Sequence, residues 1–250
     1  MLGEESDAMP VNNIEGSGSV PLPATERRAD ATVKREVLGD SVYEAVKAMV
    51  MDHVIQPGAR VGIEALSRSL GVSPTPVREA LARLEADGLV LKRSLAGYRA
   101  TELLDRRDVE ELFEMRLLLE PRAAALAAEQ ADDAVFDRIE SLVEEMQGLP
   151  DQGHSFAVYG RFAVLDQRFH DALASASGRT LLAAAVERLH THLHLFRLSP
   201  VTGGSPATAV EHSRILRAVL RRNPERAEEA MREHLELSLG RHLRRYEGGA

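Results

Sequence analysis

Residues 71–81 read Gly71-Val72-Ser73-Pro74-Thr75-Pro76-Val77-Arg78-Glu79-Ala80-Leu81, the most specific stretch of the chain. Gly71 permits a tight turn, and Ser73 can cap the helix that follows it. Pro74 and Pro76 fall in the first helical turn, where a missing backbone N–H costs nothing. The stretch therefore predicts a helix from about Pro74 to Asp87 that begins directly after a turn.

Apolar and polar positions separate along this predicted helix. Val77, Leu81 and Leu84 repeat at helical spacing and are expected to dock the helix on a core, so that Arg78 projects outward. An arginine there can pair with guanine or with phosphate, and the free amides after Ser73 suit a DNA phosphate. Arg78 is therefore the strongest candidate for a DNA contact.

The neighbouring residues complete a winged helix-turn-helix. Helical patterns on both sides of Pro57-Gly58 predict two helices before residue 71, and Gly88 is a natural end for the third. Two short strands are expected at 89–91 and 98–101, with Ala96-Gly97 near the turn. Three helices and a β-hairpin wing in this order define a DNA-binding domain over residues 37–103. Ser73, at the start of the helix, is a further candidate DNA contact. Three others, for each of which an ordinary exposed side chain is the alternative, are Thr75, Lys92 and Arg99.

The segment from Val42 to Thr101 resembles the winged helix-turn-helix of the GntR family of transcription regulators. The matching pieces are Pro57-Gly58, Leu66-Ser67, residues 75–81, Leu84-Glu85, Gly88-Leu89-Val90 and the wing around Gly97. The resemblance implies sequence-specific DNA binding and a DNA-contacting role for Arg78. Pro74 departs from the family, which usually carries a DNA-touching basic residue at this position. The departure puts the family's usual operator preference in doubt.

After Thr101 the sequence pattern is helical to the end. Asn223 as N-cap with Pro224 at the first helical position is a clear start signal. Residues 104–246 are therefore predicted to form an all-α helical bundle, and the whole chain is expected to be mainly α. The expected helices are 105–130, 132–147, 154–176, 180–198, 206–222 and 224–246.

Four ionisable residues of this second domain occupy positions where the helical period calls for apolar side chains. Asp166 and His170 are four residues apart and share a helix face, while His212 and His234 interrupt apolar stripes on two later helices. Burial of such groups without a partner costs on the order of several kcal/mol. A shared divalent metal held by one carboxylate and three imidazoles would avoid that cost. Hydrogen-bonded core histidines are the alternative, and spacing alone leaves the two interpretations even. A rival set is His190, His192 and His194.

Residues 105–246 resemble the FCD effector domain of the FadR subfamily, which follows a GntR-type DNA module. The matching pieces are residues 112–116 with Glu120, residues 166–170, His212 and His234. In metal-binding members an Asp, a His four residues later and two further histidines bind a divalent ion, often zinc or nickel. The resemblance thus implies a metal at Asp166, His170, His212 and His234, and an effector carboxylate at Arg116. Arg179 departs from the family, which carries Asn after this turn.

Composition limits the remaining possibilities. The 250 residues include no cysteine, which excludes disulfides and thiolate chemistry. No apolar run approaches a membrane span and no secretory signal opens the chain, so a cytoplasmic location is expected. The net charge is −8, yet residues 37–103 carry eight positive and eight negative charges, so DNA affinity must depend on where a few arginines and lysines lie. Residues 1–36 lack an apolar period and are expected to form a flexible tail, although Arg27, Arg28, Lys34 and Arg35 could form a DNA-contacting arm.

These observations together predict a transcription regulator rather than an enzyme. We expect a homodimer that binds a pseudo-palindromic operator, with one winged helix at each half-site. A small carboxylic acid effector would bind at the metal and Arg116, and by resemblance it would release the protein from DNA, as in a repressor. Two alternatives remain: a DNA-binding regulator with a purely structural metal, and a metal-dependent hydrolase fused to a DNA-binding module.

Overall fold

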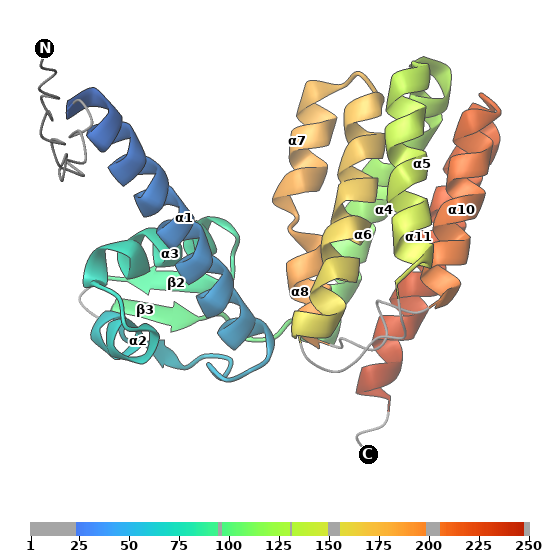
Figure 1. Cartoon of the computed structure of the whole chain (residues 1–250). Helices are drawn as coiled ribbons and strands as arrows, with labels where there is room; N and C mark the ends of the chain where they lie inside the picture. The colour runs from blue at the N-terminus through green and yellow to red at the C-terminus, as the bar shows by residue number, and fades with distance from the viewer. Residues whose placement is uncertain (1–23, 95–96, 131, 150–155, 199–205, 248–250) are drawn as a thin grey trace, which may run out of the picture. The chain divides into compact units, whose positions relative to one another are not determined.

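A computed structural model describes residues 24–94, 97–130, 132–149, 156–198 and 206–247 (Figure 1). The chain divides into two compact units, residues 1–38 and 39–250. The first helix, α1, runs from Ala24 to Met51, so residues 24–36, which the sequence analysis places in a flexible tail, are helical. Residues 24–35 are rich in Ala and Arg, and these good helix formers support a helix without an apolar stripe.

The remaining elements of the winged module follow the predicted order. They are β1 (Arg60–Val61), α2 (Ile63–Leu70), α3 (Pro74–Ala86), β2 (Val90–Arg93) and β3 (Gly97–Ala100). The strands form an antiparallel sheet in the order β1-β3-β2. The predicted hairpin is therefore present, while β1 was not expected, because two residues are too short to show an alternating pattern. Of the predicted Ala96-Gly97 turn, Ala96 lies outside the described residues.

The helix-turn-helix is held by the apolar face that the sequence predicts. Val77, Leu81 and Leu84 are fully buried, and burial of each such side chain stabilises the fold by about 1.5–3 kcal/mol. Gly71 ends α2 with φ +66°, a left-handed conformation that a side chain would strain. Gly88, at φ +73°, follows the end of α3 in the same way. Arg78 is thereby fixed on the exposed side of α3.

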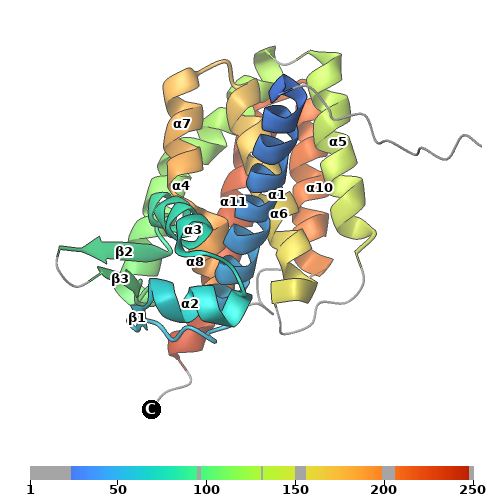
Figure 2. The ribbon, with the colours of Figure 1, turned by 60° about the vertical axis from the view of Figure 1, so that its left-hand side comes forward.

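The second domain is a bundle of helices that lie side by side in both views (Figures 1 and 2). The prediction of an all-helical domain is confirmed, except that the expected helix 180–198 is two helices. His190 separates them because it adopts φ +43°, outside the right-handed helical region. The helices are α4 (Arg106–Gln130), α5 (Asp133–Gln147), α6 (Phe156–Ala176), α7 (Thr180–Arg188), α8 (Thr191–Leu198), α10 (Pro206–Leu220) and α11 (Pro224–Leu243), and a 3-10 turn, Arg244–Tyr246, follows.

Packing inside the bundle places its polar residues together. The helix α11 lies along α4 and α10, and α4 also packs against α6. The side chain of Asn223 accepts a hydrogen bond from the backbone N–H of Arg226, which confirms the predicted N-cap of α11. None of the helices that the structure describes has both the length and the apolarity that crossing a membrane requires.

Candidate metal centre

Three of the predicted metal ligands meet in the bundle core. His170 on α6, His212 on α10 and His234 on α11 are each less than 5% exposed. One ring nitrogen from each lies within 4.8 Å of the others. Two imidazole nitrogens bound to one tetrahedral zinc ion, each at the usual Zn–N distance of about 2.0–2.1 Å, lie about 3.4 Å apart, so the rings would have to turn inward to close on an ion. The three imidazoles therefore fit a divalent metal.

His212 gives the strongest reason to expect an ion here. Its side chain is fully buried, and neither ring nitrogen has a hydrogen-bond partner. One face of the ring stacks on Phe169, with 4.2 Å between the ring centroids. Asp166 lies 3.6 Å from the His212 ring, measured from Oδ1 to Nε2, so the predicted carboxylate is adjacent to the three histidines. An imidazole without a hydrogen-bond partner, beside a carboxylate, is a donor set that suits a divalent metal.

A buried carboxylate supports each of the other two histidines. Glu120 Oε2 lies 2.6 Å from His170 Nδ1, and Glu211 Oε2 lies 2.8 Å from His234 Nδ1. Glu211 can only accept from His234 Nδ1–H, so the Nε2 lone pair of that ring is left for another partner. The Nε2 of His170 lies 3.5 Å from Arg116 Nη2. Arg241 donates to both oxygens of Glu211, at 2.6 and 2.8 Å. Such outer carboxylates fix the ring orientation and strengthen a histidine as a ligand.

Burial keeps His212 and His234 neutral, while hydrogen bonds and neighbouring cations keep the carboxylates of Glu120 and Glu211 ionised. Burial and then the neighbouring His234 lower the pKa of His212 well below its usual value. Burial likewise lowers the pKa of His234 to about 4, against the opposing effect of Glu211. Burial alone would raise the pKa of Glu211, but the hydrogen bonds from His234 and Arg241 lower it to about 2. Neutral imidazoles are the form that binds metals.

A small cavity opens beside the histidines, and Arg116 lines it. It has a volume of about 20 Å³, which holds about one water molecule. Arg116 donates from Nε and Nη2 to the two oxygens of Glu120, at 2.6 and 3.2 Å. This predicted effector-binding arginine is therefore already paired in the structure. The other lining residues are Asp166, Thr191, Leu195, Phe196, Thr208, His234, Ser238 and His242.

The sequence did not single out several residues of this site. Ser238 and His242 lie four and eight residues after His234 on α11, so the helical period could have placed them on the same face. His242 is 3% exposed, its Nδ1 has no hydrogen-bond partner, and burial lowers its pKa to about 4. Glu211 offered no signal of this kind, because it adjoins His212 in sequence and its partners come from another helix.

The rival histidine set does not form a comparable cluster within the described residues. His190 lies between α7 and α8, His194 is partly buried on α8, and the side chain of His192 is outside the description.

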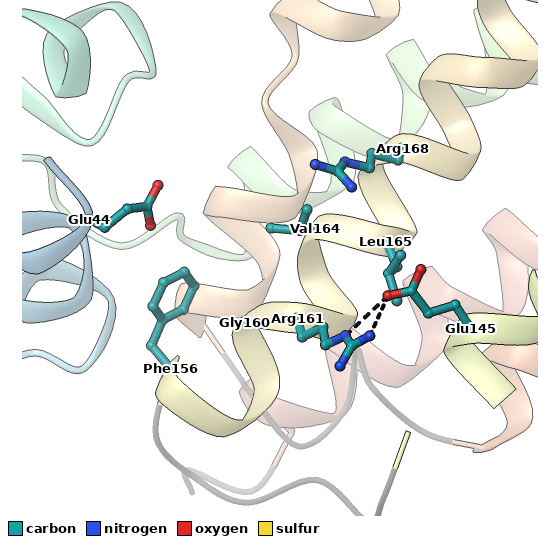
Figure 3. A pocket seen from close by; sticks show the side chains of 8 residues that line it. All are labelled: Glu44, Glu145, Phe156, Gly160, Arg161, Val164, Leu165 and Arg168. Atoms are coloured by element: carbon teal, nitrogen blue, oxygen red, sulfur yellow. Dashed lines mark hydrogen bonds and ion pairs between the residues drawn. The ribbon is translucent and has the colours of Figure 1, made fainter. Parts of the chain in front are cut away.

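A larger hollow of about 480 Å³ lies along α6, where Arg161 donates to Glu145 at 2.7 and 3.1 Å (Figure 3). The Arg161–Glu145 ion pair in this hollow is solvent-exposed, with 65% of the Arg161 side chain accessible. The pair therefore offers no buried polar group to a ligand.

The candidate DNA contacts occupy the exposed surface of the winged module. Ser73, Thr75 and Arg78 lie exposed in the first turns of α3 and just before it. Ser73 has the extended backbone of an N-cap, but its side chain makes no capping hydrogen bond. Lys92 is exposed on β2, while Arg99 on β3 donates to the carbonyl of Gly58 at 2.6 Å. The exposed start of α3 therefore offers a free helix N-terminus together with an arginine.

Comparisons with known proteins agree with both halves of this description. Residues 38–99 match the family model described as bacterial regulatory proteins, gntR family. Residues 111–237 match the FCD domain. Ser238, Arg241 and His242 lie beyond the second matched segment, although they belong to the site described above.

Curated relatives and solved structures point the same way. The HTH-type transcriptional regulators YdhC and LutR of Bacillus subtilis are 31% and 34% identical to the chain, over 77% and 75% of its length and 85% and 93% of their own. The solved structure of Escherichia coli McbR/YncC has a TM-score of 0.63 at 22% identity and covers 84% of the chain and 98% of its own. A putative GntR regulator from Rhodococcus sp. RHA1 reaches 0.61 at 21% identity, over 82% and 97%. These two structures share the fold of the chain.

Proposed function

Because the chain belongs to the GntR family of bacterial regulatory proteins and carries an FCD domain, we propose that a small carboxylate, bound at a divalent metal, controls its binding to DNA. The chain is a DNA-binding transcription regulator, and the curated relatives named above are regulators rather than enzymes. The hydrolase alternative has no support from them. The proposal concerns the class of the ligand, the identity of the metal and the effect of the ligand on DNA binding.

The single observation that carries the proposal is the orphaned, fully buried His212 between His170 and His234. Zinc or nickel would be held there by the three imidazoles with Asp166, and would supply a Lewis-acidic anchor for a ligand oxygen. Glu120 and Glu211 orient two of the imidazoles. Arg116, at the edge of the cavity, would offer its remaining N–H groups to the same carboxylate.

DNA recognition is assigned to the exposed start of α3. Arg78 would contact a base edge or phosphate in the major groove, while Ser73 and Thr75 would contact phosphate, and Lys92 and Arg99 would act from the wing. A homodimer would place two such helices on the half-sites of a pseudo-palindromic operator. Release of the operator by the effector requires that the carboxylate bind the DNA-competent and DNA-incompetent arrangements unequally. We propose this repressor response, in a cytoplasmic protein.

Thermal unfolding of the full chain, loaded with zinc or stripped by a chelator, tests the effector site. A ligand that binds the native state raises the unfolding midpoint by mass action. We expect small carboxylates to raise it only when zinc is present, and to weaken binding to a DNA duplex selected for affinity. A zinc effect without any carboxylate effect would make the ion structural and overturn the proposal. Sedimentation of the chain at twice its monomer mass is expected for the dimer, and a monomer would refute it.

A further inference from the structure

We infer that the effector is a monocarboxylate, so that acids with two or three carboxylates bind the site poorly. The inference rests on the proposed function and specifies the charge of the ligand. It follows from the charged side chains that contact the three histidines, line the cavity or pair with a residue that does. These side chains are Arg116, Glu120, Asp166, Glu211 and Arg241.

The inventory of charge at the site is short. Two guanidinium groups, of Arg116 and Arg241, face three carboxylates, of Glu120, Asp166 and Glu211, which leaves the protein groups with one excess negative charge. The imidazoles are neutral when they bind a metal. Burial raises the pKa of Asp166, but a divalent ion would hold this carboxyl group ionised and would bring the net charge of the site to plus one. One carboxylate from a ligand brings it to zero, and a second would return it to minus one.

Burial makes this balance decisive for binding. The side chains of the Arg116–Glu120 pair are each 4% exposed, and those of Glu211 and Arg241 are 9% and 13% exposed. An unbalanced charge held among such groups loses its hydration, and little solvent screens its neighbours. Each of the two arginines is already paired with a carboxylate of the chain, so neither is left to neutralise a second ligand anion. A second ligand carboxylate could at most share the guanidinium of Arg116 with Glu120, and no cation of the site would neutralise its charge.

The shape of the cavity favours the same class of ligand. Its volume of about 20 Å³ suits about one water molecule, so even a small acid must displace side chains on entry. Leu195 and Phe196 form part of the wall and offer contacts to a short apolar tail but no partner for a second charge. Thr191 and Ser238 add hydroxyl groups, which can pair with a neutral polar substituent.

Calorimetric titration of the zinc-loaded full chain with matched acids tests the inference. Succinate and succinamate have nearly the same size and differ by one negative charge, as do malate and its monoamide; propionate and lactate extend the series to smaller monoanions. We expect the best monoanion to bind at least 10-fold more tightly than succinate and malate, with each amide ahead of its diacid. Diacids that bind as tightly as their amides would overturn the inference but leave the proposed function standing. No binding by any carboxylate would refute both.

A pair of substitutions at one position isolates the charge from the shape. Ser238→Asp and Ser238→Asn have nearly equal size, and both remove the same hydroxyl group from the cavity wall. We expect the aspartate variant to bind the best monoanion at least 10-fold more weakly than the asparagine variant, because it brings the zinc-loaded site to zero before the ligand arrives. Zinc content, measured on both proteins, must be equal for the comparison. Equal affinities for the monoanion would contradict the charge argument.

Discussion

Replacement of His212 by leucine should change the stability of the protein in opposite directions with and without metal. In the metal-free protein, both imidazole nitrogens are buried without a partner, and such an unsatisfied polar group costs about 1–3 kcal/mol. Leucine removes that cost but loses the ring stack on Phe169, which contributes about 0.5–1.5 kcal/mol. His212→Leu is therefore expected to stabilise the chelator-treated protein by about 1 kcal/mol.

With zinc the sign reverses, because the variant lacks a ligand. Zinc present at 100 times its dissociation constant stabilises the native state by about 2.7 kcal/mol. At roughly 2–4 °C per kcal/mol for a domain of about 150 residues or more, the wild-type midpoint should rise by about 5–10 °C on zinc addition. The variant should show almost no rise, and so should become the less stable of the two.

Far-UV circular dichroism is the suitable assay, because the chain is largely helical and contains no tryptophan. Phe169→Leu is the matched control, since it removes the same ring stack and leaves the three histidines in place. That variant should keep the zinc response of the wild type. A His212→Leu protein that is destabilised in chelator and still gains as much as the wild type from zinc would refute the assignment of His212 as a ligand.

Three further predictions concern the outer carboxylate, the DNA contact and the response to acid. Glu211→Gln should lower zinc affinity by about 10–100-fold, measured by competition with a chelating dye, because His234 loses the carboxylate that orients it; unchanged affinity would contradict this role. Arg78→Ala should weaken binding to a selected DNA duplex by about 1–3 kcal/mol, whereas Arg138→Ala on α5 should leave binding unchanged. Equal affinities of the two variants in a fluorescence anisotropy titration would contradict the DNA contact assigned to Arg78. The pKa of buried His242 is about 4, against 6.5 in the unfolded chain. As pH falls from 6.5 to 4, the unfolded state therefore takes up a proton on this histidine before the folded state does. The free energy of unfolding should fall by up to about 1.4 kcal/mol per pH unit because of this group. His242→Phe should flatten that part of the slope in urea titrations with chelator present, and an unaltered slope would contradict the assignment.

Most of the fold could be predicted from the sequence because its helices have clear periods and clear ends. Val77, Leu81 and Leu84 define one buried face, and Asn223 with Pro224 marks the start of α11. The break at His190 could not be foreseen, since no glycine or proline interrupts the helical pattern there. The start of α1 at Ala24 was missed because helix propensity, without an apolar stripe, carries little weight in a periodicity argument.

Some residues of the candidate metal site could also be predicted from the sequence, and others could not. His170, His212 and His234 could be predicted because a polar residue inside an apolar stripe needs a partner. The pairing of Arg116 with Glu120 spans one helical turn and was within reach of the sequence. The contact of Glu211 with Arg241 was not, since it depends on how α10 lies against α11. Contacts between helices distant in sequence therefore account for what sequence reasoning missed.

The order of the ligands along the chain affects how the protein is made. The imidazoles come from α6, α10 and α11, so the metal site cannot close before residue 234 has left the ribosome. The winged module ends near residue 100, and domains generally fold as units in the order of their synthesis. A nascent chain therefore contains the DNA-reading helix before it contains all the residues of the proposed metal and effector site. Each half-site reader is therefore made before the site that is proposed to control it.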